Sequence, residues 1–291
     1  MKAAASSSKG ASSKLVRLKT LLGEMDSLVV AYSGGVDSTF LLRAAMDSTA
    51  SKVIAVTTDS PTNTREEIDR ALAMADAMGA RHLVRDVNEL ETAGYAANPA
   101  HRCYLCKTTL YPLCRGIADK EGARWVADGV NTDDLGDYRP GLLAAEEHGI
   151  RHPLVEARLG KDEIRSLSRA YHLPTADLPA SPCLSSRFPY GVHIDRRRLK
   201  QVASAEAALR KLGFIELRVR HLGDSARVEI AAAEHHRLQD PQLRSEIIRR
   251  IGECGFSSVA LCDRPLRSGS LNDEVLREKS AAERAQDLRD P

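Results

Sequence analysis

A run of small and polar residues, Ala31 to Ser38, follows an apolar segment of strand length and precedes a helical pattern. The adjacent glycines Gly34 and Gly35 let the backbone approach an anion, while Ser33 and Ser38 add hydroxyl donors. The N-terminus of the following helix favours negative charge. The run lacks the lysine of a Walker A motif and the spacing of a dinucleotide fingerprint. We expect a polyphosphate ligand here, and the alternative is a glycine-serine turn without a ligand.

Two further segments carry cysteines in positions where they could react or bind a metal. Cys103 and Cys106 form a C-x-x-C pair ahead of a helical stretch, and Cys183 lies between prolines with Arg187 four residues later. An arginine near a cysteine helps to hold a thiolate, and an exposed thiolate is nucleophilic. A structural cysteine is the alternative for Cys183. Because the chain shows no export signal, we expect its six cysteines to bind metal, react or pack rather than form disulfides.

The first half of the chain alternates apolar runs of strand length with helical patterns, which predicts a doubly wound α/β fold with a parallel sheet. A helix over 65–78 begins at a capping box formed by Thr64 and Glu67 and ends before Gly79. In such sheets ligands bind beyond the carboxyl ends of the strands, so the segments that follow the strands should meet at one nucleotide. The expected strands cover 28–33, 53–58, 82–87 and 125–130, and the segments are 33–38, 57–60 and 128–134.

The last of these segments, Asp128 to Asp134, places short polar side chains where a strand ends. Carboxylates there can hold a Mg²⁺ ion that bridges phosphates or can bind a ribose, and the alternative is an Asx-type turn. Arg139 can reach a phosphate or a substrate carboxylate, or lie on the surface. The residues predicted to bind the nucleotide are Ser33, Gly34, Gly35, Asp37, Ser38, Thr58, Ser60, Gly129, Asp134 and Arg139.

The proline-rich stretch from Pro174 to Pro189 predicts a linker followed by a rigid functional loop. The helix expected over 195–212 places Glu206 on its apolar face, where a lone carboxylate would be costly to bury. Glu206 therefore either pairs with an arginine or takes part in the chemistry. In the following strand, Arg218 and Arg220 share one face, which suits a phosphate monoester or a solvated surface. A second strand, a helix and a third strand are expected over 226–230, 241–254 and 259–262.

Length and charge set limits on the class of protein. The 291 residues suffice for two domains, and the net charge of +2 gives no general reason to expect a polyanionic partner. No apolar run approaches the length of a membrane span and no signal peptide is apparent, so we expect a cytoplasmic protein. The expected parts are a disordered tail over 1–13, a nucleotide-binding domain over 14–174, a smaller α+β domain over 175–270 and a charged tail over 271–291.

The run from Ser33 to Ser38 resembles the SGGxDS loop of the PP-loop ATP pyrophosphatases, which cleave ATP to AMP and pyrophosphate. Two further motifs, Arg102 to Lys107 and Cys183 to Gly191, extend the likeness, so that the chain from Lys14 to Leu266 resembles the LarE family of ATP-dependent sulfur transferases. The resemblance implies that ATP, with Mg²⁺, adenylylates a carboxylate of a pyridinium mononucleotide. Sulfur then replaces the adenylate to leave a thiocarboxylate, and two rounds give the bisthiocarboxylic acid needed for a nickel-pincer nucleotide cofactor.

The resemblance also implies roles for residues of the second domain. Arg218 and Arg220 would bind the phosphate of the substrate mononucleotide, and Glu206 would lie near the sulfur-donating cysteine, where it could remove a proton or contact a metal. Arg187 would complete the catalytic set with Cys183. The family further implies a small-molecule substrate and a homo-oligomer.

The source of the sulfur stays open at this point. In the family's sacrificial form, the cysteine matching Cys183 gives up its own sulfur and becomes dehydroalanine. Cys103, Cys106 and Cys183 together could instead hold a 4Fe-4S cluster whose fourth iron binds a hydrosulfide, as is implied for one branch of the family. The remaining alternatives are zinc, with His101 as a fourth ligand, a redox pair, and two unconnected helix cysteines without a role.

Two other functions fit part of this pattern. A PP-loop enzyme that thiolates tRNA would share the ATP chemistry and the three cysteines, but it should show a basic face or an RNA-binding domain. The near-neutral charge of the chain argues against a nucleic-acid partner. A nucleotide-binding module without catalytic activity would bind ATP and release no pyrophosphate.

Overall fold

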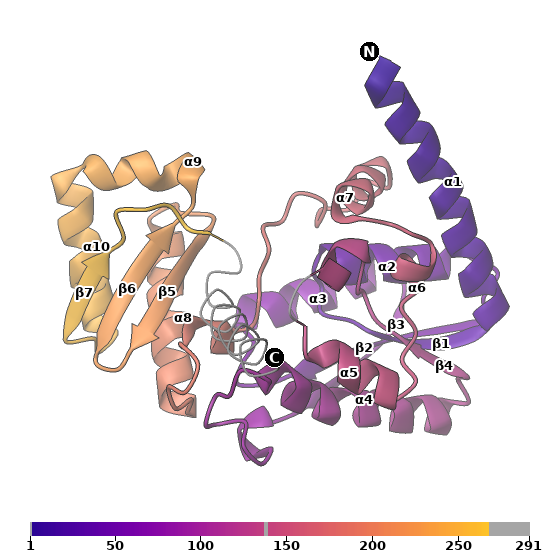
Figure 1. Ribbon diagram of the computed structural model, residues 1–291, viewed down its shortest axis with the longest axis horizontal. Coiled ribbons are helices and arrows are strands. Elements are labelled where there is room, and N and C mark those ends of the chain that lie inside the picture. Colours follow the sequence, from indigo (N-terminus) through magenta and orange to yellow (C-terminus); the bar gives the residue numbers. More distant parts are fainter. Residues whose placement is uncertain (1, 137–138, 268–291) are drawn as a thin grey trace, which may run out of the picture. The chain divides into compact units, whose positions relative to one another are not determined.

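The computed structural model describes residues 2–136 and 139–267, with side chains from Gly10 onward (Figure 1). The charged tail expected over 271–291 lies outside these residues. The chain forms two compact units. The first unit comprises Met1–Thr92 and Cys103–Ser181, and the second unit comprises Ala93–Arg102 and Pro182–Pro291.

The first unit contains a parallel sheet of four strands in the order β3-β2-β1-β4, which confirms the α/β fold expected from the sequence. The chain builds outward from β1 to β3 on one side and then crosses to place β4 on the other side of β1. The order of the strands therefore switches between β1 and β4, and ligands bind at such switch points in open α/β sheets. The strands are β1 Ser27–Ala31, β2 Lys52–Asp59, β3 Arg81–Asp86 and β4 Trp125–Ala127.

Helices cover both faces of this sheet, and alternate residues of β1 enter two separate cores. Leu28 and Val30 pack with α1, α2 and α7, whereas Val29 packs with α4 and α5. The capping box of α3 is present, with Thr64 accepting from Glu67 N at 3.2 Å. The helical segments are α2 Val36–Met46, α3 Arg65–Ala77, η1 Glu89–Glu91, α4 Arg102–Glu121, η2 Thr132–Gly136, α5 Gly141–Glu147, α6 Pro153–Glu156 and α7 Lys161–Ala170.

The N-terminal segment differs from the expected disordered tail over 1–13. Helix α1 runs from Lys2 to Met25, and its apolar residues Leu18, Leu22 and Met25 are buried on the sheet. Ala11 is buried in the same core, so the packed part of the helix extends into the segment expected to be a tail. No helix in the described part of the chain is both long and apolar enough to cross a lipid bilayer.

The second unit is a smaller α+β assembly, as expected. Strands β5 and β6 form an antiparallel hairpin, and β7 pairs with β6 in parallel. The N-cap Asp195 and the helix-ending Gly213, with φ of +83°, bound α8 close to where the sequence predicted. The segments are η3 Leu184–Arg187, α8 Arg196–Lys211, β5 Leu217–Leu222, β6 Ser225–Ile230, α9 Ala232–His235, η4 His236–Gln239, α10 Pro241–Glu253 and β7 Ser258–Leu261.

The boundary between the units differs from the expected one at 174/175. Residues 174–181 stay with the first unit because the Arg165 guanidinium donates to Ala176 O at 2.6 Å and to Leu178 O at 2.7 Å. Ser181 donates to Glu67 at 2.5 Å. In addition, the segment 93–102 belongs to the second unit although it interrupts the first in sequence. Its hydrogen bonds to the Cys183 loop, described below, give the reason.

Candidate functional site

The loop from Ser33 to Ser38 joins β1 to α2 in the first unit, and small residues determine its shape. Gly34 has φ of +68°, and a Cβ there would lie 2.8 Å from Ala71 Cα, so the position requires glycine. Arg70 Nε donates to Gly34 O at 3.2 Å, and the hydroxyls of Ser33 and Ser38 lie 3.0 Å apart. Helix α3 therefore supports the loop from outside.

The start of α2 leaves hydrogen-bond donors available. Gly35 is the N-cap and supplies no side-chain acceptor, so no cap satisfies the first-turn amides that lack intrahelical partners. Ser33 is exposed beside them, and Ser38 is buried. Free amides at a helix N-terminus attract phosphate, which supports the expectation of a polyphosphate ligand.

The three segments expected to meet do lie together. Thr57 Oγ1 donates to Tyr32 O at 2.7 Å, which joins the end of β2 to the end of β1. A Cβ on Gly129 would lie 2.9 Å from Ser38 N, so the backbone after β4 approaches the loop as closely as glycine permits. Thr58, half-buried, and Ser60, buried, follow at the end of β2. That these positions bind a nucleotide stays a prediction.

Lys161 is a residue of this edge that the sequence reasoning missed. Its ammonium lies 2.5 Å from Asp37 Oδ2, and its backbone N–H donates to Asp133 at 2.7 Å. The other carboxylate oxygen, Asp37 Oδ1, is buried and has no hydrogen-bond partner among the described residues. One sequence signal could have pointed to Lys161. A lysine in the first turn of a helix is unfavourable beside the helix dipole, so its presence there suggests a role outside the helix.

The acidic segment after β4 is largely occupied by internal contacts. Asp128 is buried and accepts from Tyr111 OH at 2.7 Å and lies 2.7 Å from His152 Nδ1. Burial opposes its ionisation, but the hydrogen bond and charge of His152 outweigh burial and hold the pKa of Asp128 below its ordinary value. Asp134 accepts from Asn131 N at 3.0 Å and pairs with Arg139 at 2.6 Å. These contacts match the turn alternative, and the metal and ribose roles stay predictions.

The C-x-x-C pair lies in the first turn and a half of α4, in the first unit. Cys103 is exposed, and Cys106 is half-buried with Sγ 4.0 Å from Glu89 Oε1. Burial raises the pKa of Glu89, which the sequence reasoning did not single out. Cys183 belongs to the second unit. No group of three His, Cys, Asp or Glu side chains that could hold a metal is found within residues 2–136 and 139–267, and the cluster on Cys103, Cys106 and Cys183 stays a prediction.

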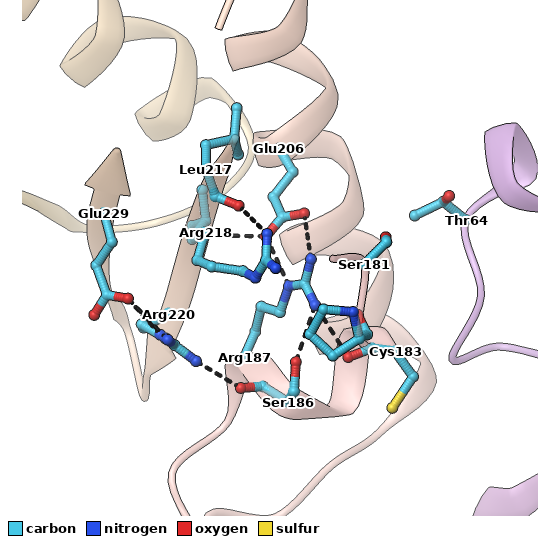
Figure 2. A network of polar contacts seen from close by, with 12 residues as sticks. Thr64, Ser181, Cys183, Ser186, Arg187, Glu206, Leu217, Arg218, Arg220 and Glu229 are labelled. Carbon is cyan, nitrogen blue, oxygen red and sulfur yellow. Dashed lines mark hydrogen bonds and ion pairs between the residues drawn. The ribbon is translucent and has the colours of Figure 1, made fainter. Parts of the chain in front are cut away.

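Figure 2 shows how Arg187 organises the loop that carries Cys183 in the second unit. Arg187 is 2% exposed, and Nη1 donates to the carbonyl oxygens of Pro182 and Cys183 and to the Ser186 hydroxyl. Cys183 itself is half-buried at the N-cap of η3. Arg187 therefore fixes the backbone on both sides of the thiol, while its expected contact with a thiolate stays a prediction.

Glu206 pairs with an arginine, which was one of the two alternatives from the sequence. Its oxygens accept from Arg187 Nε at 2.8 Å and Nη2 at 2.9 Å, from Arg210 at 3.2 Å and from Val219 N at 3.1 Å. Burial disfavours its charged form, but Arg187 outweighs burial and holds the pKa of Glu206 below its ordinary value. A carboxylate with this many donors is a weak proton acceptor, so the geometry favours a positioning role.

Arg218 and Arg220 lie on one face of β5, as expected, and both contact neighbours (Figure 2). Arg220 is buried, pairs with Glu229 at 2.8 Å and donates to Ser186 O at 2.8 Å. Arg218 donates to Leu217 O at 2.6 Å. Arg220 therefore ties this face of the sheet to the loop that carries Cys183.

The sequence reasoning missed the contacts that Tyr95 and Asn98 make with the Cys183 loop, because these residues lie far from the loop in sequence. Tyr95 OH lies 2.8 Å from Ser185 Oγ, and Asn98 Nδ2 donates to Pro189 O at 2.6 Å. Asn98 is fully buried at φ of +55°, and its carbonyl accepts from Gly191 N at 2.9 Å. An asparagine before a proline is a turn signal, but nothing local says which loop it supports.

Comparison with known proteins agrees with this geometry. The model of the queuosine biosynthesis protein QueC matches residues 27–110. An uncharacterized protein of Synechocystis is 41% identical over 89% of this chain and 97% of its own length. The pyridinium-3,5-bisthiocarboxylic acid mononucleotide synthase of Lactiplantibacillus plantarum is 35% identical over 92% of this chain and 97% of its own length.

The probable tRNA sulfurtransferases among the more distant matches cover only about half of the chain. A probable tRNA sulfurtransferase of Methanothermobacter thermautotrophicus is 25% identical over 55% of this chain and 43% of its own length. The similarity to the Lactiplantibacillus synthase, in contrast, runs through both units. The chain therefore belongs to the LarE family of PP-loop enzymes.

Proposed function

We propose that the protein is an ATP-dependent sulfur transferase that converts a carboxylate of a pyridinium dicarboxylate mononucleotide to a thiocarboxylate. The observation that carries the proposal is the hydrogen bond from Arg220 to Ser186 O, at 2.8 Å. It joins an arginine-bearing strand suited to a substrate phosphate to the loop of Cys183. The similarity along both units to a synthase of that product supports the choice of substrate.

In the first step, a substrate carboxylate oxygen attacks the α-phosphorus of ATP and pyrophosphate leaves, which gives an acyl adenylate. Ser33 and the first-turn amides of α2 would bind the phosphates, and Lys161 would offset charge that develops on the pyrophosphate. Asp37 Oδ1, buried and without a hydrogen-bond partner among described residues, fits a ligand of the Mg²⁺ that accompanies ATP.

In the second step, a sulfur nucleophile attacks the carbonyl carbon and AMP leaves. With the thiolate of Cys183 as nucleophile, the product is a thioester between enzyme and substrate. Removal of the Cys183 Cα proton then breaks the Cβ–S bond, so the substrate leaves as a thiocarboxylate and the residue becomes dehydroalanine. Each chain would supply one sulfur atom by this route, and two chains would be needed for a bisthiocarboxylate.

A 4Fe-4S cluster on Cys103, Cys106 and Cys183 would instead supply a bound hydrosulfide. The three cysteines belong to two units, and we derive no step through a cluster. Both routes require Cys183. Arg187 and Glu206 act as positioning residues in both, because they fix the carbonyl groups beside the thiol.

The test uses the full chain, ATP, Mg²⁺ and pyridinium-3,5-dicarboxylic acid mononucleotide, with mass spectrometry of the small molecules. We expect a product in which sulfur replaces oxygen, lost in Cys183→Ala and kept in Cys262→Ala, a half-buried cysteine of the same unit. Formation of that product by Cys183→Ala would contradict the proposal.

The same samples decide the source of the sulfur. We would purify the protein anaerobically, reconstitute it with iron and sulfide, and compare iron content with Cys103→Ala and Cys183→Ala variants. Iron lost in both variants would indicate a cluster, whereas a colourless protein whose mass falls by one H₂S per product would indicate sacrifice of Cys183.

The expected homo-oligomer and cytoplasmic location stay predictions. Thiolation of tRNA is the less favoured function, because the probable tRNA sulfurtransferases match only about half of the chain.

A further inference from the structure

One face of the β5-β6 hairpin carries more charge than the proposed substrate contacts explain. Side chains alternate across the sheet, so Arg218 and Arg220 of β5 share a face with Arg227 and Glu229 of β6. The register pairs Arg218 with Glu229 and Arg220 with Arg227. Among the described strand residues of this face, Glu229 is the one carboxylate, so these strand residues carry more positive than negative charge.

Glu229 bridges two of the arginines. Its Oε2 accepts from Arg220 Nε at 2.9 Å, and its Oε1 lies 3.1 Å from Arg227 Nη2. Its side chain is only 9% exposed, while that of Arg227 is 44% exposed. Glu229 therefore sets the spacing between a buried arginine and one that reaches solvent.

Two arginines placed directly opposite each other on a hairpin repel, and the single carboxylate of Glu229 that they share leaves a net positive charge on the Arg220–Arg227 pair. Arg227 Nε is buried and has no hydrogen-bond partner among the described residues, so part of the guanidinium is left unsatisfied. Burial is the largest cause that lowers the pKa of Arg218, to about 10; the charges of Arg187 and Arg220 lower it further, and those of Glu206 and Glu216 oppose the shift. A dianionic ligand would relieve both features.

We propose that Arg227 is the third arginine of a phosphate dianion site, together with Arg218 and Arg220, and that Glu229 holds Arg220 and Arg227 at the required spacing. The inference rests on the proposed function and extends it. Arg220 is tied to Ser186 in the Cys183 loop, so a phosphate on this face anchors the substrate within the unit that carries the thiol. Arg227 contributes to affinity for the phosphate group and not to the chemistry at the carboxylate.

The test compares nicotinate mononucleotide with nicotinate riboside, which share the pyridinium carboxylate but differ by the phosphate. Dissociation constants are measured by calorimetry on the full chain. A charge-assisted hydrogen bond contributes enough that Arg227→Gln should weaken mononucleotide binding by about tenfold or more. Riboside binding should be unchanged, and Arg227→Lys should recover only part of the loss because it keeps charge without the planar fork.

The controls separate this inference from the proposed function. Arg249→Gln removes an exposed arginine of α10 in the same unit that also pairs with a glutamate, and it should leave both constants unchanged. If Arg220→Gln weakens mononucleotide binding and Arg227→Gln does not, the role of Arg227 is overturned while the phosphate face stands. If the wild-type chain binds the mononucleotide no better than the riboside, the phosphate face itself is overturned.

Discussion

The two units hold their candidate residues in opposite ways. In the first unit, glycines and backbone contacts shape the phosphate loop, and a buried atom such as Asp37 Oδ1 is left without a partner among the described residues. In the second unit, the charged residues pair with one another, as in the Arg187–Glu206 bridge, whose side chains are 2% and 0% exposed. The phosphate loop therefore leaves polar atoms for a ligand to contact, whereas the Arg187–Glu206 bridge satisfies its own charges.

This difference separates the expected effects of mutation. A substitution at the phosphate loop should change ATP use with little effect on folding. A substitution in the network around Cys183 should change folding stability and catalysis together, because the same bonds perform both tasks.

The largest effect is expected for Glu206→Ala, which leaves the Arg187 guanidinium buried and unpaired. Removing one partner of a buried ion pair costs about 3–5 kcal/mol of unfolding free energy. Denaturant unfolding measures it, with Glu253→Ala as the control, since Glu253 forms an exposed pair in the same unit. A loss no greater than that of the control would show that the network is not what holds the loop.

Lys161→Ala should change ATP use in the first unit and leave folding stability nearly unchanged. The Lys161–Asp37 pair is partly exposed and adds little stability, but loss of a charge-assisted contact to phosphate should lower the rate of ATP-dependent pyrophosphate release about tenfold to hundredfold.

Lys14 offers a matched control for Lys161, because it forms a pair of similar length and exposure with Glu163 and has no recorded contact with the phosphate loop among the described residues. Lys14→Ala should change stability to the same small extent and leave pyrophosphate release intact. Equal rates of pyrophosphate release in the two variants would show that Lys161 does not act at the nucleotide site.

Gly129→Ala should have a smaller effect of the same kind. The added Cβ would approach Ser38 N to 2.9 Å and push the loop away from the end of β4, at a cost of about 1–3 kcal/mol. We expect a raised KM for ATP. Gly136→Ala, where a Cβ meets nothing within 4 Å, is the control, and a similar KM in both variants would refute the close approach.

The smallest effect concerns pH. Burial lowers the pKa of His152, but the hydrogen bond and charge of Asp128 outweigh it and raise the pKa above its ordinary 6.5. A raised pKa in the folded state means that the stabilisation is full below pH 6.5 and is lost as pH rises through the higher value. Unfolding free energies of wild type and His152→Asn should converge at alkaline pH. A constant difference between them would contradict the charged pair.

Local sequence signals predicted the parts of the fold that local interactions decide. The parallel sheet, the Thr64 and Glu67 capping box and the place of Glu206 on the buried face of its helix were available from periodicity and spacing, whereas its arginine partner was one of two alternatives. That Arg218 and Arg220 lie on one face of β5 followed from the alternation of side chains along a strand.

The remaining features depend on tertiary contacts that no local pattern contains. The segment 93–102 joins the second unit through Tyr95 and Asn98, whose partners lie about 90 residues away. The boundary shifted to Ser181 because Arg165 holds the linker by its carbonyl groups. Lys161 reaches Asp37 across 124 positions of the sequence, which spacing alone does not reveal.

The central claim is that one chain couples ATP activation to sulfur transfer. The most direct test is to measure pyrophosphate and thiocarboxylate in the same reaction with pyridinium-3,5-dicarboxylic acid mononucleotide. The account predicts one pyrophosphate for each sulfur installed, and neither product without ATP. Thiocarboxylate formed without ATP, or pyrophosphate released with no thiocarboxylate from a chain whose Cys183 is intact, would contradict it.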